Sequence, residues 1–252
     1  MTNILRAALL ALALPFTALP QPGFAADPSS FTPAQRDEIV RVVRQALKAD
    51  PSILRDAVTS LQADDQTREA AESRDAIKNN QKALLATFGD PEAGNPNGDV
   101  TVVEFYDPRC PYCRKMLPGI DAMLQRDHKV RLVYKDIPVL GEASVLEAKA
   151  MLAAQKQGAY LKMQTALMTD PAQPNPDMLL QKARFLGLDP QKFTTDVNSP
   201  AVQAKLKENL ALSRNLKVTG TPTFVIGNTV IPGMVDAGQL EQAVADARKH
   251  AG

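Results

Sequence analysis

The two cysteines of this chain lie close together in the segment EFYDPRCPYCRK, residues 104–115. A Cys-x-x-Cys pair at the start of a helix can exchange electrons with an external disulfide, because unpaired backbone N–H groups and the helix dipole stabilise a thiolate there. We expect Cys110 to be the exposed nucleophile, and Cys113, one turn into the helix, to resolve the mixed disulfide formed with a substrate. The intervening Pro111 and Tyr112 would tune the stability of the thiolate.

Two other roles for the cysteine pair are less well supported. A structural disulfide would close a very short loop, where the loss of chain entropy in the unfolded state is smallest. A zinc site would need two further soft or imidazole ligands, and the only histidines are His128 and His250. We expect His128 to be a solvated surface residue, since it lies in a charged turn. Redox chemistry is therefore favoured, with no metal and no other cofactor.

The elements that must position the pair have an α/β pattern. Residues 99–107 (DVTVVEFYD) are β-branched and aromatic, as in a buried strand. The cysteines follow at the start of a helix that runs to about Arg126, and residues 129–139 predict a second strand. Residues 142–216 show helix after helix with no strand signal. Residues 221–233 then predict a hairpin, and a last helix closes the chain.

The region before this domain predicts helices without a core of their own. The first helix should start at a capping box with proline at the first helical position, formed by Thr32, Pro33 and Gln35. Apolar residues recur at helical spacing over 39–47 and again, in a second short helix, over 53–61. Residues 62–88 are polar nearly all round, which predicts a solvent-exposed helical linker. Because the apolar stripes have no local partner, we expect copies of the chain to associate through them.

The first 25 residues have the pattern of a secretory signal peptide. A short apolar run follows Arg6, and Gly23-Phe24-Ala25 offers small residues where a signal peptidase reads. The run is shorter than the roughly 20 apolar residues that span a bilayer. We therefore expect cleavage after Ala25, export to the periplasm, and no membrane span in the mature protein.

The remaining chain is predicted to have three parts. Residues 26–62 form a helical oligomerisation region, residues 63–90 a helical linker, and residues 91–252 a catalytic domain with a helical insertion at about 142–216. Lys and Arg number 29 against 28 Asp and Glu. Such a balanced charge produces no bulk field that would attract nucleic acid or anionic lipid, so no nucleic-acid partner is expected.

The order of these motifs resembles the thioredoxin superfamily. The shared features are the strand–CPYC–helix unit, the later Thr221-Pro222 that opens a hairpin, and the final helix. In that family this proline is cis and lies against the cysteines, although only about 5–6% of X–Pro bonds in general are cis. The backbone of the preceding residue, here Thr221, would pair with an extended substrate.

The resemblance also implies roles for two charged strand residues. Glu104 lies six residues before Cys110, where thioredoxin-like proteins keep a buried acid beneath the disulfide. Such an acid could take the proton of Cys113 if burial raises its pKa. Lys135 in the second strand is expected to be the partner charge of Glu104.

Two larger features resemble particular branches of the superfamily. The insertion at 142–216 looks like that of DsbA-type periplasmic oxidoreductases, and the N-terminal helices look like those of the suppressor-of-copper-sensitivity (ScsC-type) branch, which trimerise. The implied fold class is an α/β thioredoxin fold with a helical insertion, preceded by an α-helical oligomerisation arm. Tyr112 departs from the histidine of the best-known DsbA oxidases, which weighs against a very strongly oxidising pair.

The leading functional hypothesis is an exported disulfide isomerase or reductase acting on misfolded or misoxidised proteins. A membrane thiol reductase (DsbD-like) would keep Cys110 reduced, and the expected assembly is a homotrimer, with a dimer as the alternative. A second hypothesis is a DsbA-like oxidase served by a DsbB-like quinone-linked partner. A third, from another class, is a copper-binding protein that uses the same thiols, because soft thiolates suit Cu(I).

Overall fold

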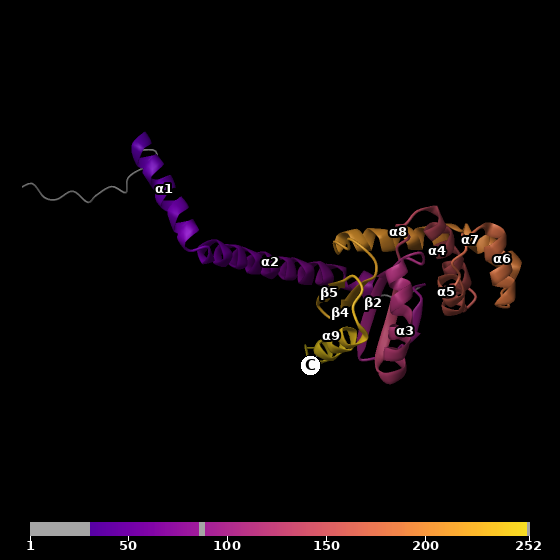
Figure 1. The fold of residues 1–252 in the computed structure, drawn as a ribbon. Coiled ribbons are helices and arrows are strands. Elements are labelled where there is room, and N and C mark those ends of the chain that lie inside the picture. The colour runs from indigo at the N-terminus through magenta and orange to yellow at the C-terminus, as the bar shows by residue number, and fades with distance from the viewer. Residues whose placement is uncertain (1–30, 86–88, 251–252) are drawn as a thin grey trace, which may run out of the picture. The chain divides into compact units, whose positions relative to one another are not determined.

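The computed structural model describes residues 31–85 and 89–250 (Figure 1). The predicted signal peptide and its cleavage site after Ala25 lie outside the described residues. By its internal contacts the chain divides into two compact units, Met1–Leu61 and Gln62–Gly252. None of the helices within the described residues is long and apolar enough to cross a membrane.

The first unit contains helix α1 (Pro33–Ala49) and the beginning of α2. The predicted capping box is confirmed, because Thr32 Oγ1 accepts a hydrogen bond from Gln35 N at 3.3 Å and Thr32 N donates to Gln35 Oε1 at 2.9 Å. No residue of α1 is buried. Large apolar side chains are exposed at Ile39, Val40, Val43, Leu47, Ile53, Leu54, Val58 and Leu61. The apolar stripes predicted from the sequence are therefore uncovered in the single chain.

Helix α2 runs without interruption over Ser52–Leu85. The sequence predicted a short helix followed by a separate solvent-exposed linker, but no glycine or proline interrupts this stretch and strong helix formers fill it. The last turns also differ from the prediction, because Ile77 and Leu84 are buried against the sheet. The end of α2 is thus part of the second unit's core rather than a free linker.

The second unit is built on a five-stranded sheet with the order β1-β3-β2-β4-β5. Its strands are β1 (Glu92–Gly94), β2 (Val100–Tyr106), β3 (Val130–Asp136), β4 (Thr223–Ile226) and β5 (Thr229–Pro232). β2 and β3 are parallel, whereas the other neighbours are antiparallel. The predicted strands and hairpin are confirmed.

Strand β1 was not predicted, because it is only three residues long and lies among glycines and prolines. A glycine at position 94 makes the pairing possible. Gly94 has a φ of +73°, and a Cβ built there would lie 2.5 Å from the carbonyl oxygen of Val130 in the segment that it pairs with. Only a residue without a side chain fits at this distance and in this conformation.

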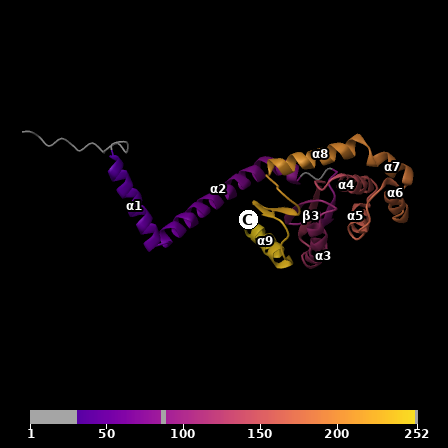
Figure 2. The same cartoon turned by 45° about the horizontal axis from the view of Figure 1, so that its top comes forward.

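Alternation along β2 and β3 divides their side chains between two faces of the sheet. One, called here the cysteine face, is covered by α3 (Pro111–Arg126) and α9 (Ala237–His250). The other, called the opposite face, is covered by the end of α2 and the end of α8 (Pro200–Asn215), which lie together in Figure 2. Asn215 Nδ2 donates to Asn80 Oδ1 at 3.1 Å between these two helices.

The segment predicted to be a helical insertion contains α4 (Glu142–Gln155), α5 (Tyr160–Met168), α6 (Pro176–Phe185), α7 (Pro190–Val197) and α8, with no strand (Figure 1). Three of these helices start with a capping side chain followed by proline, at Asn175, Asp189 and Ser199. Met151, Met163 and Leu167 of this block join the core of the cysteine face. The insertion therefore packs directly beside the redox pair.

Candidate active site

The cysteine pair opens helix α3, as the sequence predicted. Cys110 is the N-cap residue and Pro111 is the first helical residue, which places Cys113 one turn inside. Both cysteines are free thiols. Tyr112 is 53% exposed, but Cys110 is only 4% exposed. The prediction of an exposed Cys110 is therefore wrong in this reduced structure, because the segment that contains Pro222 packs against its sulfur.

The Thr221–Pro222 segment completes the site. Its peptide bond is cis, and Cys110 Sγ donates a hydrogen bond to Thr221 O at 3.2 Å. The structure thus brings the pair Cys110–Cys113 next to the pair Thr221–Pro222, although more than a hundred positions separate the two pairs in the sequence. Thr221 is also the residue whose backbone, by the resemblance, is expected to pair with an extended substrate.

Cys113 needs a base before it can act as a nucleophile. Burial raises the pKa of the Cys113 thiol, and the negative charge of Glu104 raises it further. Glu104 is itself only 2% exposed. Burial, followed by the charge of Asp136, raises the Glu104 pKa to about 8. A carboxyl group with such a pKa can both accept and release a proton near neutral pH, as general acid–base catalysis requires.

Lys135 does not partner Glu104, and that prediction is wrong. In the parallel register Lys135 pairs with Phe105, whereas Glu104 pairs with Tyr134. The alternation of side chains therefore sends Lys135 to the opposite face. There its Nζ bonds Asp90 Oδ2 at 2.5 Å and Ala83 O at 2.9 Å.

Asp107 holds the loop before the cysteines, a role that sequence reasoning missed. Its Oδ1 accepts hydrogen bonds from Arg109 N at 2.7 Å and from Ser144 Oγ at 2.8 Å. Its Oδ2 accepts from the backbone N–H groups of Val139 and Leu140 at 2.8 and 3.0 Å. These bonds tie the loop after β2 to the loop after β3 and to α4. An aspartate at the end of the predicted strand 99–107 was the only available signal.

Two arginines join the cysteine loop to the helical insertion. Arg109 Nη1 donates to Glu147 Oε1 at 3.2 Å and to Ala172 O at 2.9 Å. Arg114 Nη1 donates to Asp170 O of the insertion at 3.4 Å, and its Nε donates to Pro108 O of the cysteine loop at 3.2 Å. No periodicity reveals such contacts, because their partners lie far along the chain.

Apolar side chains are exposed close to the site. Val139 and Leu140 are each 53% exposed, next to the loop that Asp107 holds. Met234, which is 49% exposed, follows Gly233, whose N–H donates to Pro222 O at 2.8 Å. Together with Tyr112 they give exposed apolar side chains to the segments that position Cys110.

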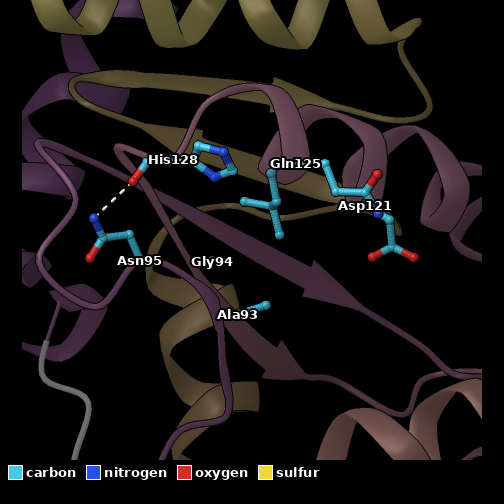
Figure 3. A pocket seen from close by; sticks show the side chains of 7 residues that line it. Ala93, Gly94, Asn95, Asp121, Gln125 and His128 are labelled. Atoms are coloured by element: carbon cyan, nitrogen blue, oxygen red, sulfur yellow. Dashed lines mark hydrogen bonds between the residues drawn. The ribbon is translucent and has the colours of Figure 1, made fainter.

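Neither histidine belongs to the site. His128 is exposed, as predicted, and its carbonyl accepts a hydrogen bond from Asn95 Nδ2 at 2.8 Å (Figure 3). It lines a shallow pocket of about 560 Å³ between β1 and α3 that contains no cysteine. Among the described residues, no group of three or more His, Cys, Asp and Glu side chains is arranged to hold a metal ion.

Comparison with known proteins gives the family of this chain. The family model described as DSBA-like thioredoxin domain matches residues 101–245, and the one described as copper resistance protein ScsC N-terminal domain matches residues 35–68. A thioredoxin-like oxidoreductase from Silicibacter pomeroyi is 42% identical with a TM-score of 0.65, covering 68% of this chain and 98% of that one. Proteus mirabilis ScsC in a transitional conformation is 28% identical with a TM-score of 0.64, covering 89% and 100%.

One curated relative is a much longer protein, and only part of it matches this chain. The Na(+)/H(+) antiporter NhaA 3 of Salinispora tropica is 29% identical over 156 residues, which cover 61% of this chain but only 24% of the antiporter. The match is therefore to one part of that protein. The chain has a thioredoxin-like α/β fold with a helical insertion, and it belongs to the family of DSBA-like thioredoxin domains and carries an ScsC-type N-terminal domain.

Proposed function

We propose that this protein is a periplasmic thiol–disulfide oxidoreductase that acts mainly as a disulfide isomerase or reductase on misoxidised exported proteins. The observation that carries the proposal is the free Cys110–Cys113 pair at the start of α3, with Cys110 Sγ 3.2 Å from Thr221 O. This arrangement combines a nucleophilic thiol, a resolving thiol and a backbone carbonyl that can pair with an extended client.

In the reductive direction the chemistry proceeds in two exchanges. The Cys110 thiolate attacks one sulfur of a client disulfide, which forms a mixed disulfide and releases the other client sulfur as a thiolate. The Cys113 thiol then gives its proton to Glu104, and its thiolate attacks Cys110 Sγ. The Cys110–Cys113 bond forms, and the second client sulfur leaves. The client gains two electrons and the protein's dithiol loses them, so a membrane reductase of the DsbD-like class would be needed to restore Cys110.

Isomerisation uses the same first exchange but no net electrons. If a third client thiolate, rather than the one just released, attacks the client sulfur of the mixed disulfide, a different client disulfide forms and the Cys110 thiolate leaves in its original reduced state. A client held by several active sites returns more often to a thiol, because the effective concentration is high. The exposed stripe of α1, together with the match to the ScsC N-terminal domain, supports assembly of copies through these helices, and we propose a homotrimer.

The test uses the full mature chain, because removing all residues before Pro91 would delete the buried Ile77 and Leu84. A double variant, Val40→Glu with Val43→Glu, places charges in the exposed stripe. Gln45→Glu on the polar side of the same helix is the matched control. We expect the wild type and the control to be oligomers by light scattering and to repair a scrambled client protein. The double variant should be monomeric and should reduce only simple disulfides.

Three results would contradict the proposal. A monomeric wild type, or a double variant that repairs scrambled clients at the wild-type rate, would remove the basis for isomerase activity. A Cys110–Cys113 pair recovered fully disulfide-bonded from its native compartment would favour the oxidase hypothesis, with a DsbB-like partner. Loss of all exchange in Cys110→Ser is required by every form of the proposal.

A further inference from the structure

A buried polar cluster lies on the cysteine face, and the proposed mechanism uses only one of its members. We call it the acid–tyrosine cluster, and it consists of Glu104, Tyr106, Tyr134, Asp136 and Tyr160. The first four form a square on the parallel strands, with Glu104 opposite Tyr134 and Tyr106 opposite Asp136. Every member is at most 2% exposed. Three of the chain's four tyrosines belong to this cluster.

Helix α5 of the insertion packs over the cluster and contributes Tyr160 to it. Tyr160 OH donates a hydrogen bond to Asp136 Oδ1 at 2.9 Å and is also bonded to Tyr106 OH. When Tyr160 donates to Asp136, its hydroxyl can only accept from Tyr106, whose own proton can otherwise point to Met151 Sδ at 3.4 Å. The rings of Tyr106 and Tyr134 meet edge to face, with centroids 5.5 Å apart. A continuous set of contacts therefore runs from the strand neighbour of Glu104 to Asp136.

Two buried polar atoms of this region lack a hydrogen-bond partner. Asp136 Oδ2 and Gln164 Nε2 are buried and have no hydrogen-bond partner among the described residues. The Gln164 side chain of α5 faces the hydroxyl groups of Tyr106 and Tyr134. A buried carboxylate oxygen without a partner is costly when ionised and less so when protonated. The surroundings of Asp136 therefore favour its protonated form.

No cation faces the two acids among the described residues. The titratable groups that act on the cluster from neighbouring elements are Cys113 and Asp121 of α3 and Asp90 before β1. Lys135, the one buried cation of β3, lies on the opposite face with Asp90. Glu104 and Asp136 occupy diagonal positions on neighbouring strands, which are roughly 7–8 Å apart in a sheet. At that separation in a poorly screened interior, ionisation of one carboxyl group opposes ionisation of the other.

We propose that Asp136 is a positioning residue for the exchange reaction. It acts through Glu104, so that the two buried carboxyl groups titrate as a coupled pair that accepts the proton of Cys113. Tyr160 of the insertion controls this pair through its hydrogen bond to Asp136. The inference rests on the proposed function, because Glu104 accepts the proton of Cys113 in the resolving step. It assigns the helical insertion a chemical role in addition to its role in the fold.

The direction of coupling follows from charge and hydrogen bonding. Burial raises the pKa of Asp136 to about 7, and the hydrogen bond from Tyr160 opposes that rise. Once Asp136 is ionised, its charge raises the pKa of Glu104. Replacing Asp136 by Asn removes this charge and lowers the Glu104 pKa. Replacing Tyr160 by Phe keeps Asp136 protonated to a higher pH, so it also lowers the pKa of Glu104, by a smaller amount.

The kinetic test follows a single turnover of a small peptide disulfide. Acid-quenched samples are separated by mass spectrometry into the mixed disulfide and the released peptide, between about pH 5 and pH 10. In the wild type the resolving step should accelerate with pH along a limb that Glu104→Gln abolishes. Asp136→Asn should move this limb down by about one pH unit, Tyr160→Phe should move it less in the same direction, and the surface control Asp99→Asn should leave it in place.

A merely structural role predicts a different outcome. Loss of packing would slow the reaction at every pH and lower the melting temperature without moving the limb. The inference is overturned if the limb stays in place in Asp136→Asn while Glu104→Gln abolishes it. It is equally overturned if Asp136→Asn and Tyr160→Phe move the limb in opposite directions.

A second measurement needs no client and separates this inference from the proposed function. The chain has no tryptophan, so tyrosine emission reports mainly on the cluster, and Tyr112→Phe removes the exposed tyrosine's background. Emission of the wild type should change in two steps, as Asp136 and then Glu104 ionise; Glu104→Gln should remove the upper step, and Asp136→Asn should move the upper step to lower pH. An absent or unmoved upper step overturns the coupling. A protein that shows the coupling but exchanges no client disulfides would refute the proposed function and leave the inference standing.

Discussion

The two faces of the central sheet bury charge in opposite ways. On the opposite face Lys135 Nζ is paired with Asp90 Oδ2 at 2.5 Å, and a second cation, Lys205, lies 3.3 Å from Asp90 Oδ1. On the cysteine face Glu104 and Asp136 are equally buried but have no cation. Lys135 Nζ also donates to Ala83 O at 2.9 Å, so the paired cation ties the end of α2 to the sheet. Unpaired acids keep their protons to near-neutral pH, where they can take part in proton transfer.

The largest expected effect comes from removing the cation of the opposite face. Lys135→Met leaves Asp90 buried with only Lys205 beside it, so we expect a loss of unfolding free energy of about 3–5 kcal/mol in urea titrations. The folded fraction should resolve mixed disulfides with the wild-type pH profile. The double variant Asp90→Asn with Lys135→Met should regain most of the lost stability. A changed pH profile in Lys135→Met would show that the faces are not independent.

A second prediction concerns the apolar part of the same face. Leu84→Ala should lower the unfolding free energy by about 2–4 kcal/mol, because it leaves a cavity between α2 and the sheet. The neighbouring Leu85 is 40% exposed, so Leu85→Ala is the matched control and should cost about 0.5 kcal/mol or less. Equal effects of the two changes in urea unfolding would mean that the end of α2 does not belong to the core.

The third and smallest effect concerns the cysteine face. The Glu104 pKa is about 8 in the folded protein and near its usual 4.5 when unfolded, so the folded state binds more protons between these values. Wild-type stability should therefore fall as pH rises, by on the order of 2 kcal/mol between about pH 6 and pH 8. Glu104→Gln should flatten this fall, apart from the contribution of Asp136. An unchanged slope in chemical denaturation would contradict the raised pKa.

Local patterns in the sequence were sufficient for most of the fold. The strand before the cysteines, the start of α3 at Cys110, the helical insertion and the capping box at Thr32 each depend on neighbouring residues, and the structure confirms them. The short strand β1 escaped detection because its pairing depends on the distant Val130 rather than on its own composition. The buried end of α2 escaped for a similar reason, since two apolar residues in a polar helix give no periodic signal.

By itself the sequence determined the chemistry available to this protein: one Cys-x-x-Cys pair at a helix start, a later Thr-Pro, and an apolar stripe at the N-terminus. Only the tertiary structure decided how these residues act. It placed Thr221 O 3.2 Å from Cys110 Sγ, paired Lys135 with Asp90 instead of Glu104, and buried Glu104 and Asp136 on the same face of the sheet. The physical reason is the alternation of side chains along paired strands, because the register between β2 and β3 decides which charges share a face, and no local pattern encodes that register.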